Sequence, residues 1–72
     1  MLINVDIGTN TKVFNKLKSL PEVKEVHLTY GVYDVIAKVE AETQEELKKV
    51  ITYKIRALHD VRSTLSMIVA WK

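Results

Sequence analysis

The order of strand-like and helix-like spacings of apolar residues along this chain constrains its fold more than any other feature. Apolar and polar residues alternate in four segments, as in half-buried β-strands, and recur every three to four residues in two others, as in amphipathic helices. The predicted strands cover residues 2–7, 25–30, 33–41 and 61–71, and the predicted helices cover residues 9–20 and 43–58. The element order is therefore βαββαβ.

Local signals mark the ends of these elements. Gly8 ends the first strand, and Pro21 stops the first helix because the residue before a proline disfavours helical geometry. Gly31 and Val32 are expected at the centre of a tight hairpin. The segment Thr43–Glu46 has the spacing of a capping box. The helix that it starts is expected to bury one apolar stripe: Leu47, Val50, Ile51, Ile55 and Leu58.

For this element order, two helices on one face of a four-stranded antiparallel sheet give the ferredoxin-like α+β fold, and residues 1–72 form a single domain. The other face of the sheet is left bare, and alternation gives it a mixture of polar and aliphatic residues: Leu2, Asn4, Asp6, Glu25, His27, Thr29, Asp34, Ile36, Lys38, Glu40, Thr64, Ser66, Ile68 and Ala70. Such a face is too apolar to be an ordinary solvated one, so we expect two copies to pair through it. The expected dimer interface contains Leu2, Ile36, Lys38, Ile68 and Ala70.

The composition removes several classes of function. The absence of cysteine excludes disulfides, thiolate metal sites and soft-metal chaperones of this fold. A net charge of +2 is too small to argue for binding to nucleic acid or acidic lipid. No apolar run approaches the roughly 18 residues of a membrane span, and a cytoplasmic location is expected.

Other activities of this fold lack their residues here. An acylphosphatase needs an arginine in the first strand–helix turn, and Gly8–Thr11 has none. An RNA-recognition module needs aromatic residues on the bare face, whereas alternation assigns Tyr30 and Tyr33 to the helix-packed face. His27 and His59 have no second metal ligand at a recognised spacing. We therefore expect no metal, no cofactor and no catalytic residue.

The hairpin sequence Gly31–Asp34, which reads G-x-Y-D and continues into Val35–Val39, resembles the effector domain of the Lrp/AsnC family of feast/famine transcriptional regulators, also called the RAM domain. The similarity covers nearly the whole chain. Further segments that agree in order and spacing are Leu20–Val23, Glu45–Leu47 and Val61–Thr64.

This resemblance implies how the domain assembles. Family regulators carry an N-terminal helix-turn-helix, whereas this chain begins at the first strand and resembles a stand-alone RAM domain without direct DNA binding. Family dimers pair through their sheets and often form octamer-like rings of four dimers, with amino acids bound between dimers. The family usually has a glycine before the last strand, where this chain has Asp60, so the shape of that turn is open.

Carried over by position, the resemblance implies a ligand site formed by Thr29, Tyr30, Gly31, Tyr33 and Asp34, with Thr64 and Ser66 from a last strand nearby. Asp34 would receive the ammonium group of an amino acid, and hydroxyls and backbone N–H groups around Gly31 would hold its carboxylate. The alternative is that Gly31 serves only the turn, Tyr33 only the core, and Asp34 only the hydrogen bonds of the turn. Both interpretations stay open.

The leading hypothesis is a non-enzymatic module that senses a small amino acid at an inter-subunit site. It would form homo-oligomers and modulate full-length Lrp/AsnC regulators by co-assembly. One alternative is a purely structural oligomerisation domain, and a less favoured one is a small ferredoxin-like enzyme, for which Asp34 is the one acid suitably placed at a turn. Neither DNA nor a membrane is an expected partner.

Overall fold

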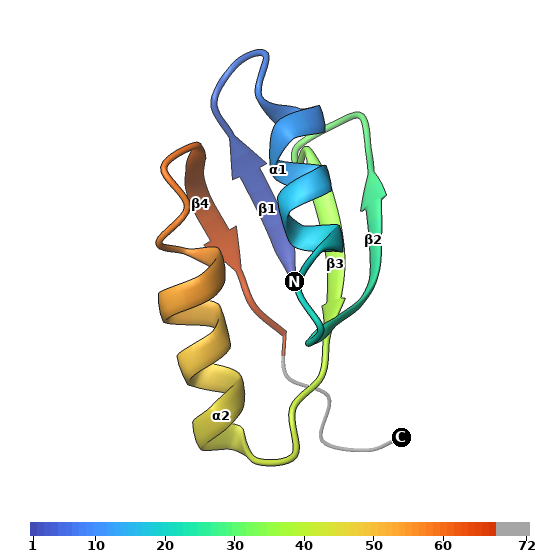
Figure 1. Cartoon of the computed structure of the whole chain (residues 1–72). Coiled ribbons are helices and arrows are strands. Elements are labelled where there is room, and N and C mark those ends of the chain that lie inside the picture. The colour runs from blue at the N-terminus through green and yellow to red at the C-terminus, as the bar shows by residue number, and fades with distance from the viewer. Residues whose placement is uncertain (68–72) are drawn as a thin grey trace.

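The computed structural model describes residues 1–67 and confirms the ferredoxin-like α+β fold. The sheet has the strand order β2-β3-β1-β4, and all neighbouring strands are antiparallel. In Figure 1, α1 crosses in front of β1 and β3. The elements in chain order are β1 (Leu2–Val5), α1 (Asn10–Lys18), β2 (Val23–Leu28), β3 (Val35–Val39), α2 (Gln44–Lys49), η1 (Val50–Ile55) and β4 (Val61–Leu65).

One apolar core lies between the sheet and the helices. The central strands β1 and β3 contribute alternate residues, and α1 and η1 each contribute residues from one side, so these two helical segments cover the same face, whereas α2 adds no buried residue. Burying an aliphatic side chain of this kind is worth roughly 1.5–3 kcal/mol. The fully or nearly fully buried residues are Ile3, Val5, Val13, Leu17, Val35, Ala37, Val50 and Ile55.

The second helix begins as predicted and then changes its winding. The Thr43 hydroxyl accepts a hydrogen bond from the Glu46 N–H at 3.1 Å, which is the expected N-terminal cap. From Val50 the helix is π-helical, and the Arg56 N–H donates to the Ile51 carbonyl at 2.7 Å. The wider turn brings Val50 and Ile55, which are five positions apart, into the same core.

The connection between β2 and β3 is a loop over residues 29–34 rather than the expected tight hairpin. The Thr29 N–H donates to the Asp34 carbonyl at 2.9 Å, and the Thr29 hydroxyl donates to the Tyr33 carbonyl at 2.6 Å. These two bonds close the loop at its base, so its shape is fixed by its own backbone and by one hydroxyl.

The loop corrects one prediction from strand alternation. Tyr30 was expected on the helix-packed face, and its side chain is instead fully exposed, whereas Tyr33 is half-buried. The alternation fails because β2 ends before Tyr30 and a loop has no two-residue period. Gly31 has a φ of +138°, a conformation that essentially only glycine adopts, so the turn requires this residue.

A β-bulge in β4 changes which side chains face the core. Val61 lies opposite Val5, and Ser63 lies opposite Asn4, so Arg62 is an additional residue in β4 with no counterpart in β1. Such an insertion exchanges the two faces for every residue that follows it.

Thr64 was predicted on the bare face, and this is wrong. It lies opposite the fully buried Ile3 and is half-buried on the helix-covered side. The bulge explains the error, because the predicted alternation ran through β4 without interruption. Ser63 and Leu65 therefore take the places on the bare face that had been assigned to their neighbours.

The face without helices, called the open face below, has an apolar row across three strands. Leu2 pairs with Ile36 on one side and Leu65 on the other, and Ile36 pairs with His27. Lys38 lies on the same face, with its Nζ 3.8 Å from a Glu25 carboxylate oxygen. The predicted placement of Leu2, Ile36 and Lys38 on this face is confirmed, whereas Ile68 and Ala70 lie outside the described residues.

Candidate functional site

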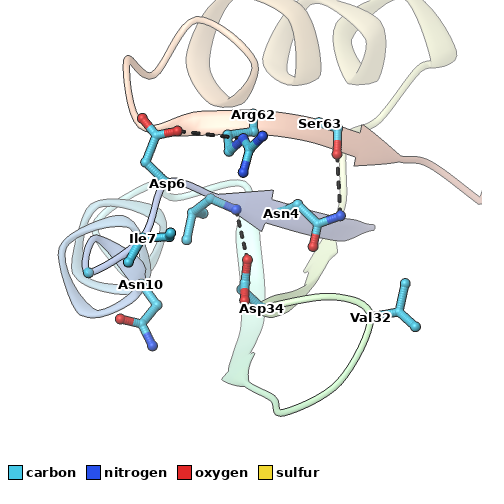
Figure 2. Close-up of a pocket in the computed structure, with 10 residues that line it drawn as sticks. Asn4, Asp6, Ile7, Asn10, Val32, Asp34, Arg62 and Ser63 are labelled. Atoms are coloured by element: carbon cyan, nitrogen blue, oxygen red, sulfur yellow. Dashed lines mark hydrogen bonds and ion pairs between the residues drawn. The ribbon is translucent and has the colours of Figure 1, made fainter.

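An open pocket of about 650 Å³ lies at the end of the open face where β1 leads into the turn before α1 (Figure 2). Its wall combines two carboxylates, one guanidinium, two side-chain amides and a hydroxyl with a few aliphatic groups. The lining residues are Asn4, Val5, Asp6, Ile7, Gly8, Asn10, Val32, Asp34, Arg62 and Ser63.

Asp34 is fixed against the end of β1. Its Oδ2 accepts the Val5 N–H at 2.9 Å, and its own N–H donates to the Ile3 carbonyl at 3.0 Å. Through these two bonds Asp34 extends the contact between β3 and β1 beyond Ile3 and Val35, which are the last paired residues of the two strands. Because a carboxylate has several lone pairs, this single bond leaves Asp34 able to accept a further donor from the pocket.

Two weaker contacts lie beside it, one from β1 to β4 and one from the residue after β1 to β4. The Asn4 amide donates to the Ser63 hydroxyl at 3.3 Å, and the Arg62 Nε lies 3.8 Å from Asp6 Oδ1. The Arg62 and Asp6 side chains are 65% and 48% exposed, so solvent screens their attraction. Figure 2 shows Asp34 and Arg62 on opposite sides of β1.

This arrangement suits a small zwitterion. Carboxylates are acceptors for an ammonium group, a guanidinium matches the geometry of a carboxylate, and amides and hydroxyls can bind either kind of group. Within residues 1–67 no cluster of His, Cys, Asp and Glu could hold a metal ion. In the same part of the chain, no helix has both the length and the apolar character needed to cross a bilayer.

The loop residues predicted as ligand contacts are placed unequally. Asp34 lines the pocket, and the other loop residue that does so is Val32, which was not predicted. The Thr29 hydroxyl is engaged by the Tyr33 carbonyl, and the Tyr30 side chain extends into solvent. Within one chain the pocket thus contains Asp34 but not Thr29, Tyr30, Gly31 or Tyr33.

The two residues predicted from the last strand lie elsewhere. Thr64 faces the core side, and Ser66 lines a second, mostly apolar pocket of about 590 Å³ together with Met1, Leu47 and Met67. That pocket is at the opposite end of β1, because β4 runs antiparallel to β1 and Leu65 is paired with Leu2. A single chain therefore does not bring Ser66 to Asp34.

Sequence reasoning missed Arg62 as a pocket residue, and it placed Asn4 and Asp6 on the bare face without a role. A signal was present in the element order. The first and last strands are neighbours in a ferredoxin-like sheet, so an acid at the end of the first and a base at the start of the last can meet. Asp6 and Arg62 are such a pair.

A family model described as the Lrp/AsnC ligand binding domain matches residues 1–70. The HTH-type transcriptional regulator FL11 of Pyrococcus furiosus is 35% identical over 69 residues, which cover 96% of this chain and 45% of that protein. A homocitrate synthase of Sulfurisphaera tokodaii is 42% identical over 74 residues, which cover 99% of this chain and 16% of that protein. The chain thus spans less than half the length of either relative.

A solved structure of comparable size has the same fold. The crystal structure of FFRP-DM1 superimposes with a TM-score of 0.92 at 41% identity, covering 94% of this chain and 91% of that one. The agreement extends over nearly the whole βαββαβ unit.

Proposed function

The chain belongs to the Lrp/AsnC ligand-binding domain family, and from this premise we propose that it is a regulatory domain that binds a small amino acid. In this proposal the domain is not an enzyme, acts in the cytoplasm as a homo-oligomer, and modulates full-length regulators of its family by co-assembly. The observation that carries the proposal is the pocket at the end of β1, whose wall presents opposite charges to one small volume.

The position of Asp34 supports amino-acid binding. Its carboxylate is oriented by the Val5 N–H and borders the pocket, so an ammonium group could bind it without any rearrangement of the loop. The turn-only alternative accounts for the bond to Val5 but not for the guanidinium and amides gathered around the same pocket. The other predicted ligand residues, Thr29, Tyr30, Gly31, Tyr33, Thr64 and Ser66, would enter the site only from a neighbouring copy or after binding.

The open face supports self-association. Ile36 and Leu65 are 40% and 47% exposed on either side of Leu2, and the sheet face that they form has no helix over it. Apolar rows of this kind gain free energy when they are removed from water. A second copy is the partner that we propose for this face, with dimers, and rings of dimers, as the assemblies.

The homocitrate synthase match favours a second candidate. A segment of that protein is similar to nearly all of this chain, so a domain of this family also occurs within a protein named as an enzyme. We propose as the second candidate that this domain regulates a biosynthetic enzyme instead of a transcription factor. Both candidates require the same ligand pocket.

The test is calorimetric titration of the whole chain with each of the twenty L-amino acids. We expect at least one to bind, and Asp34→Asn to weaken that binding about tenfold or more, because one charge-assisted bond is lost. Asparagine keeps an acceptor for the Val5 N–H, so the fold should survive. Glu45→Gln, which changes an exposed acid at the start of α2, is the matched control and should bind as the wild type does.

If none of the amino acids binds and the oligomer persists, the chain is a structural oligomerisation domain and the sensing proposal is rejected. Affinity capture separates the two candidates. The wild-type and Asp34→Asn proteins are each used as bait in the presence of the amino acid that binds. A partner that only the wild type captures depends on the ligand, and its identity as a regulator or an enzyme decides between the candidates.

A further inference from the structure

Arg62 is the one cationic side chain that lines the pocket, and it is also the inserted residue of the bulge in β4. A regular strand would give Arg62 a fixed place in the alternation, with a partner residue in β1 directly opposite. As the inserted residue it has no such partner, and bulges commonly redirect a side chain in this way. The guanidinium at the edge of the pocket therefore belongs to a residue that has no pairing partner in β1.

This guanidinium is only partly used. Among the residues that the structure describes, its single charged contact is Asp6, at 3.8 Å from Nε to Oδ1, which is beyond hydrogen-bond distance. Within residues 1–67 its terminal nitrogens make no hydrogen bond and no ion pair. An arginine in this state can offer two parallel N–H groups to a carboxylate, and such a bidentate pair is stronger than the screened contact with Asp6.

The opposite wall of the pocket supplies the complementary charge. Asp34 lies on the other side of β1 from Arg62, with its carboxylate held by the Val5 N–H (Figure 2). A free amino acid lying over the end of β1 would meet an acceptor for its ammonium group on one side and a donor for its carboxylate on the other. A ligand with only one of these groups would leave one wall unpaired.

We propose that Arg62 binds the carboxylate of the amino acid while Asp34 binds its ammonium group, and that Asp6 is an internal competitor that the incoming carboxylate displaces from Arg62. This inference rests on the proposed function and assigns the anion-binding half of the site to a side chain instead of to the loop around Gly31. It limits the ligands to free amino acids, because α-amides and simple amines lack the group that Arg62 binds.

Titration with the twenty L-amino acids and with their α-amides tests the assignment. Arg62→Gln should weaken amino-acid binding roughly 10- to 100-fold, since a bond to a charged group is lost, and should leave the already weak binding of the amides unchanged. Arg62→Lys should recover part of the loss. Arg56→Gln changes the only other arginine of the chain, which lies beyond η1 and away from the pocket, and should have no effect.

Asp6→Asn separates a competitor from a ligand contact. If Asp6 competes, its neutralisation should tighten binding about two- to fivefold, the range expected from losing one exposed ion pair. The backbone bonds of Asp6 to Asp60 and Thr9 do not involve its side chain, so the turn should be preserved. Weaker binding by Asp6→Asn would contradict the competition.

The outcomes distinguish the proposed role of Arg62 from the proposed amino-acid binding on which it rests. If the wild type binds no amino acid, both fail. If the wild type binds one and folded Arg62→Gln binds it equally well, the assignment of Arg62 is rejected and amino-acid sensing stands. Thermal melting of each variant checks folding, which the exposure of Arg62 should leave intact.

Discussion

Among single residues, Glu22 shows most directly how one contact makes the folding stability depend on pH. Its Oε2 lies 2.8 Å from the Lys54 Nζ, and the pair joins the turn before β2 to η1. The hydrogen bond from Lys54 is the largest of the effects that hold the pKa of the Glu22 carboxyl below its ordinary value of 4.5. The folded protein therefore prefers the ionised form more strongly than the unfolded chain does.

The stability that this pair contributes should depend on pH with a definite sign. Because the folded pKa is lowered, the contribution is present above about pH 4.5 and is lost as the pH falls through the folded pKa, where the unfolded chain takes up the proton first. Lys54→Met should thus make the free energy of unfolding fall less between pH 5 and pH 3. Urea denaturation at several pH values measures this slope.

Lys48→Met, which changes another lysine of the second helix, serves as the control and should keep the wild-type slope. Equal slopes in Lys54→Met and the wild type would show that Glu22 gains nothing from its partner.

At the scale of the elements, the spacing of apolar residues correctly predicted most of the residues that are buried in the core. Ile3 and Val5 in β1, and Val13 and Leu17 in α1, are in the core as their spacing requires. The errors arise where one backbone irregularity changes the period. After the bulge at Arg62, the side chains of β4 lie on the opposite faces of the sheet from those predicted. Nothing in the local composition of Val61–Leu65 marks an inserted residue.

The candidate site was predicted less completely for a related reason. Asp34 could be named because it belongs to a recognisable tetrapeptide, G-x-Y-D. The pocket around it, however, is assembled by residues from β1, the following turn and β4 that are distant in sequence. Arg62 lines this pocket beside residues of β1, so the alternation within β4 alone does not show that the two strands share a site.

The π-helical segment predicts an unusual tolerance to deletion. Removing Thr52, an exposed residue of η1, leaves Val50 and Ile55 four positions apart, which is the spacing that places two residues on one face of an ordinary α-helix. We expect the segment to rewind as an α-helix and the stability to stay within about 1 kcal/mol of the wild type.

Removal of Lys16 from α1 is the contrasting case. This helix is regular, so the deletion turns the fully buried Leu17 away from the core and should cost about 2–5 kcal/mol. Chemical denaturation compares the two deletions. A loss of that size in the Thr52 deletion would mean that the core needs the π-helical winding itself.

At the scale of the whole molecule, the open face has two unlike ends. The row Leu2, Ile36 and Leu65 is apolar, whereas the end of β1 carries the charged pocket. If two copies pair through this face, the charges near the pocket lose solvent, and an uncompensated buried charge is costly. A bound zwitterion would supply a cation to Asp34 and a carboxylate to Arg62, so we expect amino-acid binding and assembly to strengthen each other.

Ile36→Glu should abolish self-association, because it puts a charge at the centre of the apolar row. The side chain is partly exposed in the single chain, so the domain should still fold. Light scattering at matched concentrations measures the mass of the particles. Tyr53→Glu, which changes an exposed residue of η1, is the control and should retain the wild-type mass. An unchanged mass in Ile36→Glu would exclude the open face as the interface.

The loop over residues 29–34 has a consequence for how such domains diversify. Its base is closed by bonds from Thr29, while Tyr30 and Val32 at its tip are almost entirely in water and support nothing beneath them. Replacing these tip residues should therefore cost little folding stability, because neither side chain is buried in the core. Since Val32 also borders the pocket, new ligand preferences can evolve there at little risk to the scaffold.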